Sequence, residues 1–141
     1  MTAQLTRRSI LAAAVAVGAF FVAPTLTAPD AEARTVGFSE SSYKRLVASG
    51  KPFMVGVHAS WCTTCARQKR VINALRASGS PYKGLTIVEM DWDKYRGSKI
   101  AKSLKIPRRS TLIMYSGGRE VGRVVAGTSQ RQIKRLIDKG F

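Results

Sequence analysis

The order of apolar runs in this chain predicts an α/β domain with a mixed central sheet of about four to five strands flanked by helices. Two observations support this fold class. Between residues 39 and 104, helical patterns alternate with strand-like runs, which favours parallel strands joined by helices. Two further runs joined by a glycine pair predict an antiparallel hairpin, and a helical stripe follows it. A βαβ unit followed by a ββα unit therefore predicts a mixed sheet with helices on both faces.

The first 33 residues are predicted to be a cleavable export signal and are left out of the fold. Arg7 and Arg8 stand directly before an apolar stretch, which resembles a twin-arginine signal. A general secretory signal that happens to contain two arginines is the alternative. The small residues of the 31–33 segment form a cleavage pattern. We therefore expect export to a bacterial periplasm, with signal cleavage near Ala33 and one domain over residues 34–141.

The predicted domain is strongly basic. The chain has 24 lysines and arginines against 8 acidic residues, a net charge of +16, and the charges within the signal cancel. Such a charge favours encounter with an acidic partner or an anionic surface, although a well-solvated surface is the simpler interpretation. The sequence shows no nucleic-acid motif with interleaved aromatics, so we expect no nucleic-acid partner.

The first half of the domain predicts a helix, a strand and a second helix. Ser39 caps a short amphipathic helix that a serine–glycine pair ends. The run 53–59 is apolar without interruption, which suits a strand covered on both faces. The next helix begins at Cys62, continues with an apolar face in line with Cys65, and ends at the breaker cluster 78–81.

A strand and a short helix are predicted next. The run 85–91 has strand character, and a polar turn over 93–97 follows it. Residues 98–104 predict a short helix, which Pro107 closes.

The last part of the chain predicts a hairpin and a helix. Strands over 111–115 and 120–126 are joined through Gly117 and Gly118, a tight hairpin signal. Ser129 caps the final helix, whose apolar stripe faces the sheet while its basic residues face water.

Cys62 and Cys65 are the only cysteines, at the junction of a buried strand and a helix. A thiolate at a helix N-terminus is stabilised by unpaired N–H groups and by the helix dipole, which lower its pKa. A disulfide across so short a loop removes little unfolded-chain entropy. A structural zinc site lacks ligands, because His58 is the only histidine. We therefore interpret the pair as a redox-active dithiol.

The chain over residues 36–140 resembles a thioredoxin. The resemblance rests on Trp61-Cys62-x-x-Cys65 after a buried strand, on the element order, on the hairpin glycines and on the C-terminal helix. It implies a thioredoxin-like fold and a thiol–disulfide oxidoreductase that needs no cofactor and reduces or exchanges protein disulfides. It also implies that Cys62 is the attacking thiolate and Cys65 the buried resolving thiol of a redox-active disulfide, with Trp61 offering an apolar surface to a partner chain.

One departure from the thioredoxin pattern concerns proton transfer. Gly56 stands where the family has a buried Asp that takes the proton of the resolving cysteine, and Glu89 stands where a Lys usually faces that Asp. We expect that the carboxylate has moved across the strand pair, with Gly56 making room for Glu89. Burial would raise the pKa of such a carboxyl and suit it to proton exchange with a thiol. The alternative is that Glu89 points outward and has no role.

Two further departures surround the dithiol. His58 replaces a bulky aromatic and is either a packed side chain, which we favour, or a neighbour that activates Cys62 or ligates a metal. Ser110 stands at the position of the family's cis-proline, and because a non-proline cis bond costs roughly 2.5–4 kcal/mol, we expect a trans bond before it. In thioredoxins this loop pairs with the partner backbone, so the resemblance assigns Arg109, Ser110 and Thr111, with Trp61, to substrate binding.

The leading interpretation is an exported oxidoreductase that acts on protein disulfides as a reductant. The compartment is oxidising, so the dithiol needs a membrane-embedded or soluble thiol electron donor. A module or metallochaperone for a soft metal such as Cu(I) is the alternative, with Cys62, Cys65 and possibly His58 as ligands. A basic adaptor with a vestigial dithiol is a third interpretation.

Overall fold

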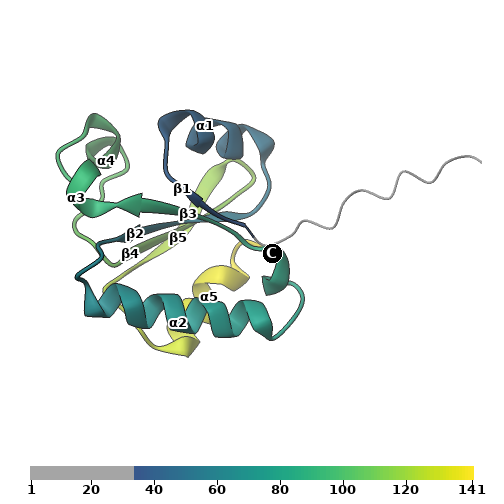
Figure 1. Cartoon of the computed structure of the whole chain (residues 1–141). Coiled ribbons are helices and arrows are strands. Elements are labelled where there is room, and N and C mark those ends of the chain that lie inside the picture. The colour runs from purple at the N-terminus through teal and green to yellow at the C-terminus, as the bar shows by residue number, and fades with distance from the viewer. Residues whose placement is uncertain (1–33) are drawn as a thin grey trace, which may run out of the picture.

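The computed structural model describes residues 34–141, so the export signal predicted for residues 1–33 lies outside the described residues. One sheet carries helices on both of its faces (Figure 1). Its strands are β1 (Thr35–Gly37), β2 (Phe53–His58), β3 (Thr86–Asp91), β4 (Thr111–Ser116) and β5 (Arg119–Val125). The helices are α1 (Glu40–Ser49), α2 (Thr63–Ala77), α3 (Trp92–Tyr95), α4 (Lys99–Ser103) and α5 (Gln130–Asp138), with a 3-10 turn, η1 (Tyr82–Gly84). Over residues 34–141 no helix is long and apolar enough to cross a membrane.

The sheet is mixed, as the sequence predicts, and has five strands in the order β1-β3-β2-β4-β5. Strands β1 and β2 both run parallel to β3, whereas β4 runs antiparallel to β2 and β5. The predicted hairpin is confirmed: Ser116 pairs with Arg119, which leaves Gly117 and Gly118 as a two-residue turn. Both glycines have positive φ, of 60° and 76°, as a tight turn that matches strand twist requires.

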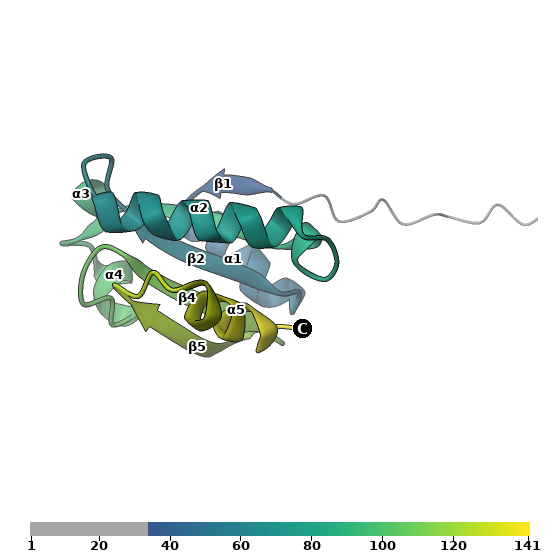
Figure 2. The ribbon, with the colours of Figure 1, turned by 90° about the horizontal axis from the view of Figure 1, so that it is seen from below.

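Each face of the sheet has its own apolar cluster. Helices α2 and α5 cover one face and lie beside each other in Figure 2, while α1, α3 and α4 lie on the opposite face. Strand β2 serves both clusters, because Met54 points to the α2 face and Val55 and Val57 point to the other. Gly56 and His58 therefore share the α2 face with Met54, which places β2 directly under the start of α2.

Three short elements were not predicted from the sequence, and one of them is the 3-10 turn η1 between the predicted breaker cluster and β3. Strand β1 has three residues at the sheet edge, too few for an alternating pattern to be recognisable. The predicted polar turn after β3 begins instead as α3, because the Asp91 carboxylate accepts hydrogen bonds from the N–H groups of Asp93 and Lys94. Elsewhere the predicted bounds differ by a residue or two, as is usual at frayed ends.

Candidate active site

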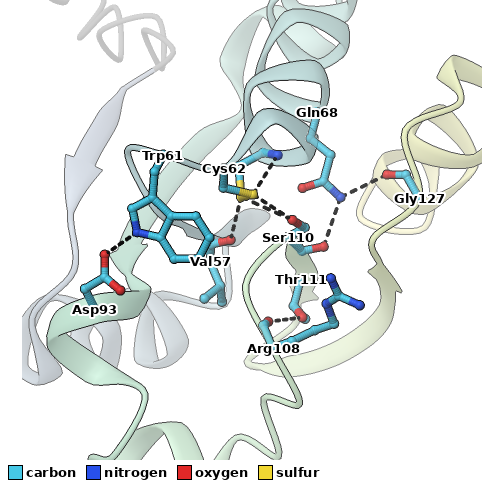
Figure 3. The surroundings of a disulfide bond; sticks show 10 residues. Val57, Trp61, Cys62, Gln68, Asp93, Arg108, Ser110, Thr111 and Gly127 are labelled. Atoms are coloured by element: carbon cyan, nitrogen blue, oxygen red, sulfur yellow. Dashed lines mark hydrogen bonds between the residues drawn. A yellow bond between two sulfur atoms is a disulfide. The ribbon is translucent and has the colours of Figure 1, made fainter.

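A disulfide joins Cys62 and Cys65 at the N-terminus of α2 (Figure 3). Cys62 is the N-cap of this helix, and its Sγ accepts a hydrogen bond of 3.1 Å from the N–H group of Cys65. Both cysteines are buried, with 6% and 8% of their surfaces exposed. Because unpaired N–H groups and the positive end of the helix dipole surround Cys62, a negative charge on its sulfur is stabilised when the disulfide is reduced.

Ser110 contacts both sulfur atoms. Its Oγ lies 3.2 Å from the Sγ of Cys62 and 3.2 Å from the Sγ of Cys65. The residue is fully buried in the loop directly before β4. A disulfide sulfur carries no hydrogen, so the serine hydroxyl is the donor in this oxidised state.

The backbone of Ser110 is held in an unusual conformation. Its φ is +62°, in the left-handed region, which costs an ordinary residue about 1–2 kcal/mol. Its N–H donates to the carbonyl of Val57 at 2.8 Å, and its carbonyl accepts from the N–H of Ala126 at 2.8 Å. The bond between Arg109 and Ser110 is trans, which confirms the sequence prediction. Hydrogen bonds to β2 and to the residue after β5 thus fix the loop where a proline was expected.

Gln68 also holds the Ser110 loop in place, and this role was not predicted from the sequence. Its Nε2 donates to the carbonyl of Ser110 at 3.0 Å and to that of Gly127 at 2.9 Å, and only 2% of the residue is exposed. A signal was present: Gln68 lies on the helix face that Cys65 and Ile72 share, since three and four residues separate it from them. A polar residue in a buried stripe needs hydrogen-bond partners.

Trp61 and Arg109 form the outer surface beside the disulfide. Trp61 is 56% exposed, and its ring Nε1 donates to Oδ2 of Asp93 at 2.8 Å. The Arg109 guanidinium lies 4.3 Å from the centre of that ring, a cation–π contact. Thr111, by contrast, is fully buried, and its hydroxyl donates to the carbonyl of Arg108. Of the four residues assigned to substrate binding, Trp61 and Arg109 therefore present side chains at the surface.

An open cavity of about 230 Å³ lies on the other flank of the disulfide, between α2 and the sheet. Gly56, Cys65 and Glu89 all line it, and Gly56 pairs with Glu89 in the parallel register of β2 and β3. A Cβ atom on Gly56 would meet only the Leu112 and Ile87 side chains, at 3.7 and 3.9 Å. Gly56 thus leaves room beside Glu89, as predicted.

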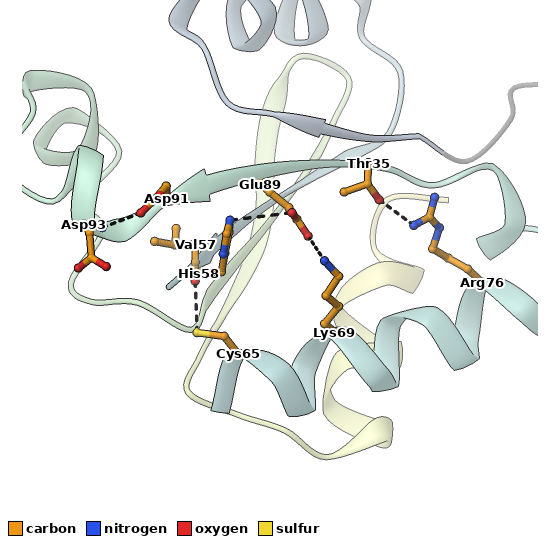
Figure 4. A network of polar contacts seen from close by, with 9 residues as sticks. All are labelled: Thr35, Val57, His58, Cys65, Lys69, Arg76, Glu89, Asp91 and Asp93. Atoms are coloured by element: carbon orange, nitrogen blue, oxygen red, sulfur yellow. Dashed lines mark hydrogen bonds and ion pairs between the residues drawn. The ribbon is translucent and has the colours of Figure 1, made fainter. Parts of the chain in front are cut away.

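The carboxylate of Glu89 points to α2 and not away from the site (Figure 4). Its Oε1 accepts from the Lys69 ammonium at 2.9 Å, and its Oε2 lies 3.9 Å from Nε2 of His58. Its side chain remains 27% exposed, so the fully buried carboxylate that we expected is not what the fold forms. The reason is Lys69, which holds Glu89 at the rim of the cavity.

His58 faces this carboxylate, with 39% of its side chain exposed. Over residues 34–141, no three His, Cys, Asp or Glu side chains gather closely enough to hold a metal ion. The fold therefore does not bring His58 to the two sulfurs as a third ligand.

Comparisons with known proteins agree with this geometry. The family model described as Thioredoxin matches residues 34–139. Thioredoxin-2 of Saccharomyces cerevisiae is 33% identical over 100 residues, which span 70% of this chain and 90% of that protein. A thioredoxin of Chlamydia muridarum is 31% identical over 101 residues, 72% of this chain and 93% of that protein. The crystal structure of Trxlp from Edwardsiella tarda superposes with a TM-score of 0.66 at 28% identity, covering 74% of this chain and 98% of that one.

Proposed function

Because the chain belongs to the thioredoxin family and is a thiol–disulfide oxidoreductase, we propose that it acts outside the cytoplasm as a reductant of protein disulfides. The observation that carries the proposal is the Cys62–Cys65 disulfide at the start of α2. A helix N-terminus favours a thiolate on Cys62, and a thiolate is the species that attacks disulfides.

The reaction uses both cysteines in turn. The Cys62 thiolate attacks one sulfur of a substrate disulfide and forms a mixed disulfide, while the second substrate sulfur leaves as a thiolate. Cys65 then attacks Cys62 and releases the substrate, which has gained two electrons. A membrane-embedded or soluble thiol donor restores the dithiol.

Export is the part of the proposal that rests on the sequence alone. The paired Arg7 and Arg8 before an apolar stretch, and the small residues before Arg34, support delivery to a periplasm. Fractionation of the producing cells tests it: we expect a periplasmic protein whose N-terminus is Arg34. Replacing both arginines by lysine blocks the twin-arginine route and leaves a general secretory route open. A full-length chain in the cytoplasm would contradict export.

The surface around the disulfide favours acidic substrates. Arg109 lies over Trp61 without a carboxylate within ion-pair distance among residues 34–141, whereas Asp93 is engaged by the Trp61 ring nitrogen. The net charge of +16 adds a long-range attraction for acidic chains. We therefore expect disulfides flanked by Asp or Glu to react fastest, with a rate that falls as salt rises.

Insulin reduction with dithiothreitol tests the enzyme itself. The full chain should accelerate insulin reduction, and Cys62→Ser should abolish the effect because it removes the nucleophile. Ser60→Ala, in the exposed loop before the motif, is the matched control and should stay active. A reduction potential near thioredoxin's roughly −270 mV supports a reductant, whereas one near −120 mV indicates an oxidant.

Measurements on the same protein preparation distinguish the Cu(I) alternative from the enzyme. A metallochaperone binds Cu(I) tightly in a ratio of about one to one and does not turn over disulfides. Tight binding without insulin reduction would replace the proposed function by that alternative. If neither activity appears and partner binding depends strongly on salt, the basic adaptor is the remaining interpretation.

A further inference from the structure

The Ser110 hydroxyl is placed equally close to the two atoms that react. Its Oγ lies 3.2 Å from each sulfur, and among residues 34–141 these sulfurs are its hydrogen-bond partners. The N–H donors at the helix start come from the backbone and are present in any helix of this kind. The serine hydroxyl is instead a side-chain donor, supplied from the far side of the disulfide by the loop before β4 (Figure 3).

We propose that Ser110 is a catalytic residue of this dithiol, whose hydroxyl donates a hydrogen bond to the Cys62 thiolate of the reduced protein and stabilises that anion. The proposal deepens the thiol–disulfide exchange proposed above and rests on it. In the exchange, the Cys62–substrate bond forms as the substrate disulfide breaks, and Cys65 later displaces the substrate sulfur from Cys62. The substrate gains two electrons, the dithiol loses them, and Ser110 keeps its own proton throughout.

The hydroxyl is held in place before the reaction begins. Ser110 is anchored through its N–H to Val57 and through its carbonyl to Gln68, and it is fully buried. A fixed donor needs no reorganisation when charge develops on the sulfur, and burial strengthens the interaction.

The same hydrogen bond favours the reduced state over the oxidised state. A thiolate is a much stronger acceptor than a neutral disulfide sulfur, so the hydroxyl stabilises the dithiol more than the disulfide. Loss of the hydroxyl should therefore make the disulfide harder to reduce, with a more negative potential.

Titration of a single thiol tests the proposal directly. In the full chain with Cys65→Ser, Cys62 is the only thiol, and its thiolate is followed by ultraviolet absorbance against pH. Ser110→Ala and Ser110→Gly should each raise the pKa of the Cys62 thiol by about one unit, a tenfold loss of acidity. Glycine tolerates a φ of +62°, so it removes the hydroxyl without backbone strain. Ser60→Ala removes an exposed serine hydroxyl nearby and should leave the titration unchanged.

The glutathione equilibrium of the two-cysteine protein gives a second readout. Both Ser110 variants should shift it toward the disulfide by about tenfold, which corresponds to about 30 mV. An unchanged thiol pKa in both folded variants would overturn the proposal, as would a shift in Ser110→Ala that Ser110→Gly does not share. Failure of the wild-type chain to reduce insulin would instead overturn the proposed function, because the thiol titration does not depend on turnover.

Discussion

The two flanks of the disulfide are built in opposite ways. On the Ser110 flank, Ser110 and Gln68 are buried and hydrogen bonded, and Gln68 joins the loop before β4 to the loop after β5. On the Gly56 flank, a cavity of about 230 Å³ opens between α2 and the sheet, and Glu89 with Lys69 closes it only partly.

The Ser110 flank therefore positions a side chain against the sulfurs, whereas the Gly56 flank gives water access to the cavity beside them. The closed flank fixes a hydroxyl against the sulfurs, because the buried backbone of Ser110 is held by hydrogen bonds to Val57, Ala126 and Gln68. The open flank lets water reach the cavity beside Cys65, because Gly56 contributes no side chain there. Changes on the closed flank should therefore cost stability, and changes on the open flank should cost little.

The largest effect is expected from Gln68→Met. Methionine keeps the apolar stem but donates no hydrogen bond, so the Gly127 carbonyl loses its Gln68 donor and the Ser110 carbonyl keeps Ala126. We expect the free energy of unfolding to fall by about 2 kcal/mol, measured by urea denaturation. Gln130→Met, at an exposed position of α5, is the matched control and should change it by less than about 0.5 kcal/mol. Equal stability of the two variants would remove the contrast between the flanks.

A smaller effect of opposite sign is expected from Gly56→Ala. The added Cβ finds ordinary contact distances of 3.7 Å and more, and alanine restricts the unfolded chain. Stability should rise by about 0.4–1 kcal/mol in the same urea experiment. Gly50→Ala is the control, because its φ of +67° strains any side chain and should lower stability. A destabilised Gly56→Ala would mean that this flank is packed and not open.

The smallest change in stability is expected from Glu89→Gln. The Lys69–Glu89 pair has side-chain exposures of 61% and 27%, so its loss should cost less than about 0.4 kcal/mol. The informative readout is the pH dependence of disulfide reduction, which should change if Glu89 takes the proton of Cys65 through the open cavity. Glu120→Gln is the control. Glu120 pairs with Arg123 on β5, so this change should leave the pH profile of disulfide reduction unchanged. An identical profile for wild type and Glu89→Gln would reject the role of Glu89.

The regular elements could be predicted because their signals are local. The unbroken apolar run of β2, the Gly117-Gly118 turn and the serine caps each act within a few residues. The expectation for Glu89 was met only in part. Register and face follow from strand periodicity, but the pairing with Lys69 depends on how α2 lies over β3.

The sequence by itself determined the chemistry and the fold class: two cysteines three positions apart at a strand–helix junction specify a dithiol, and the order of apolar runs specifies the mixed sheet. Only the tertiary structure decided which groups touch the sulfurs. Ser110 lies 48 residues from Cys62 along the chain, and Gln68 lies 59 residues from Gly127. Periodicity and capping act over a few residues, whereas these contacts exist only once β4 has paired with β2 and α2 has packed against the sheet.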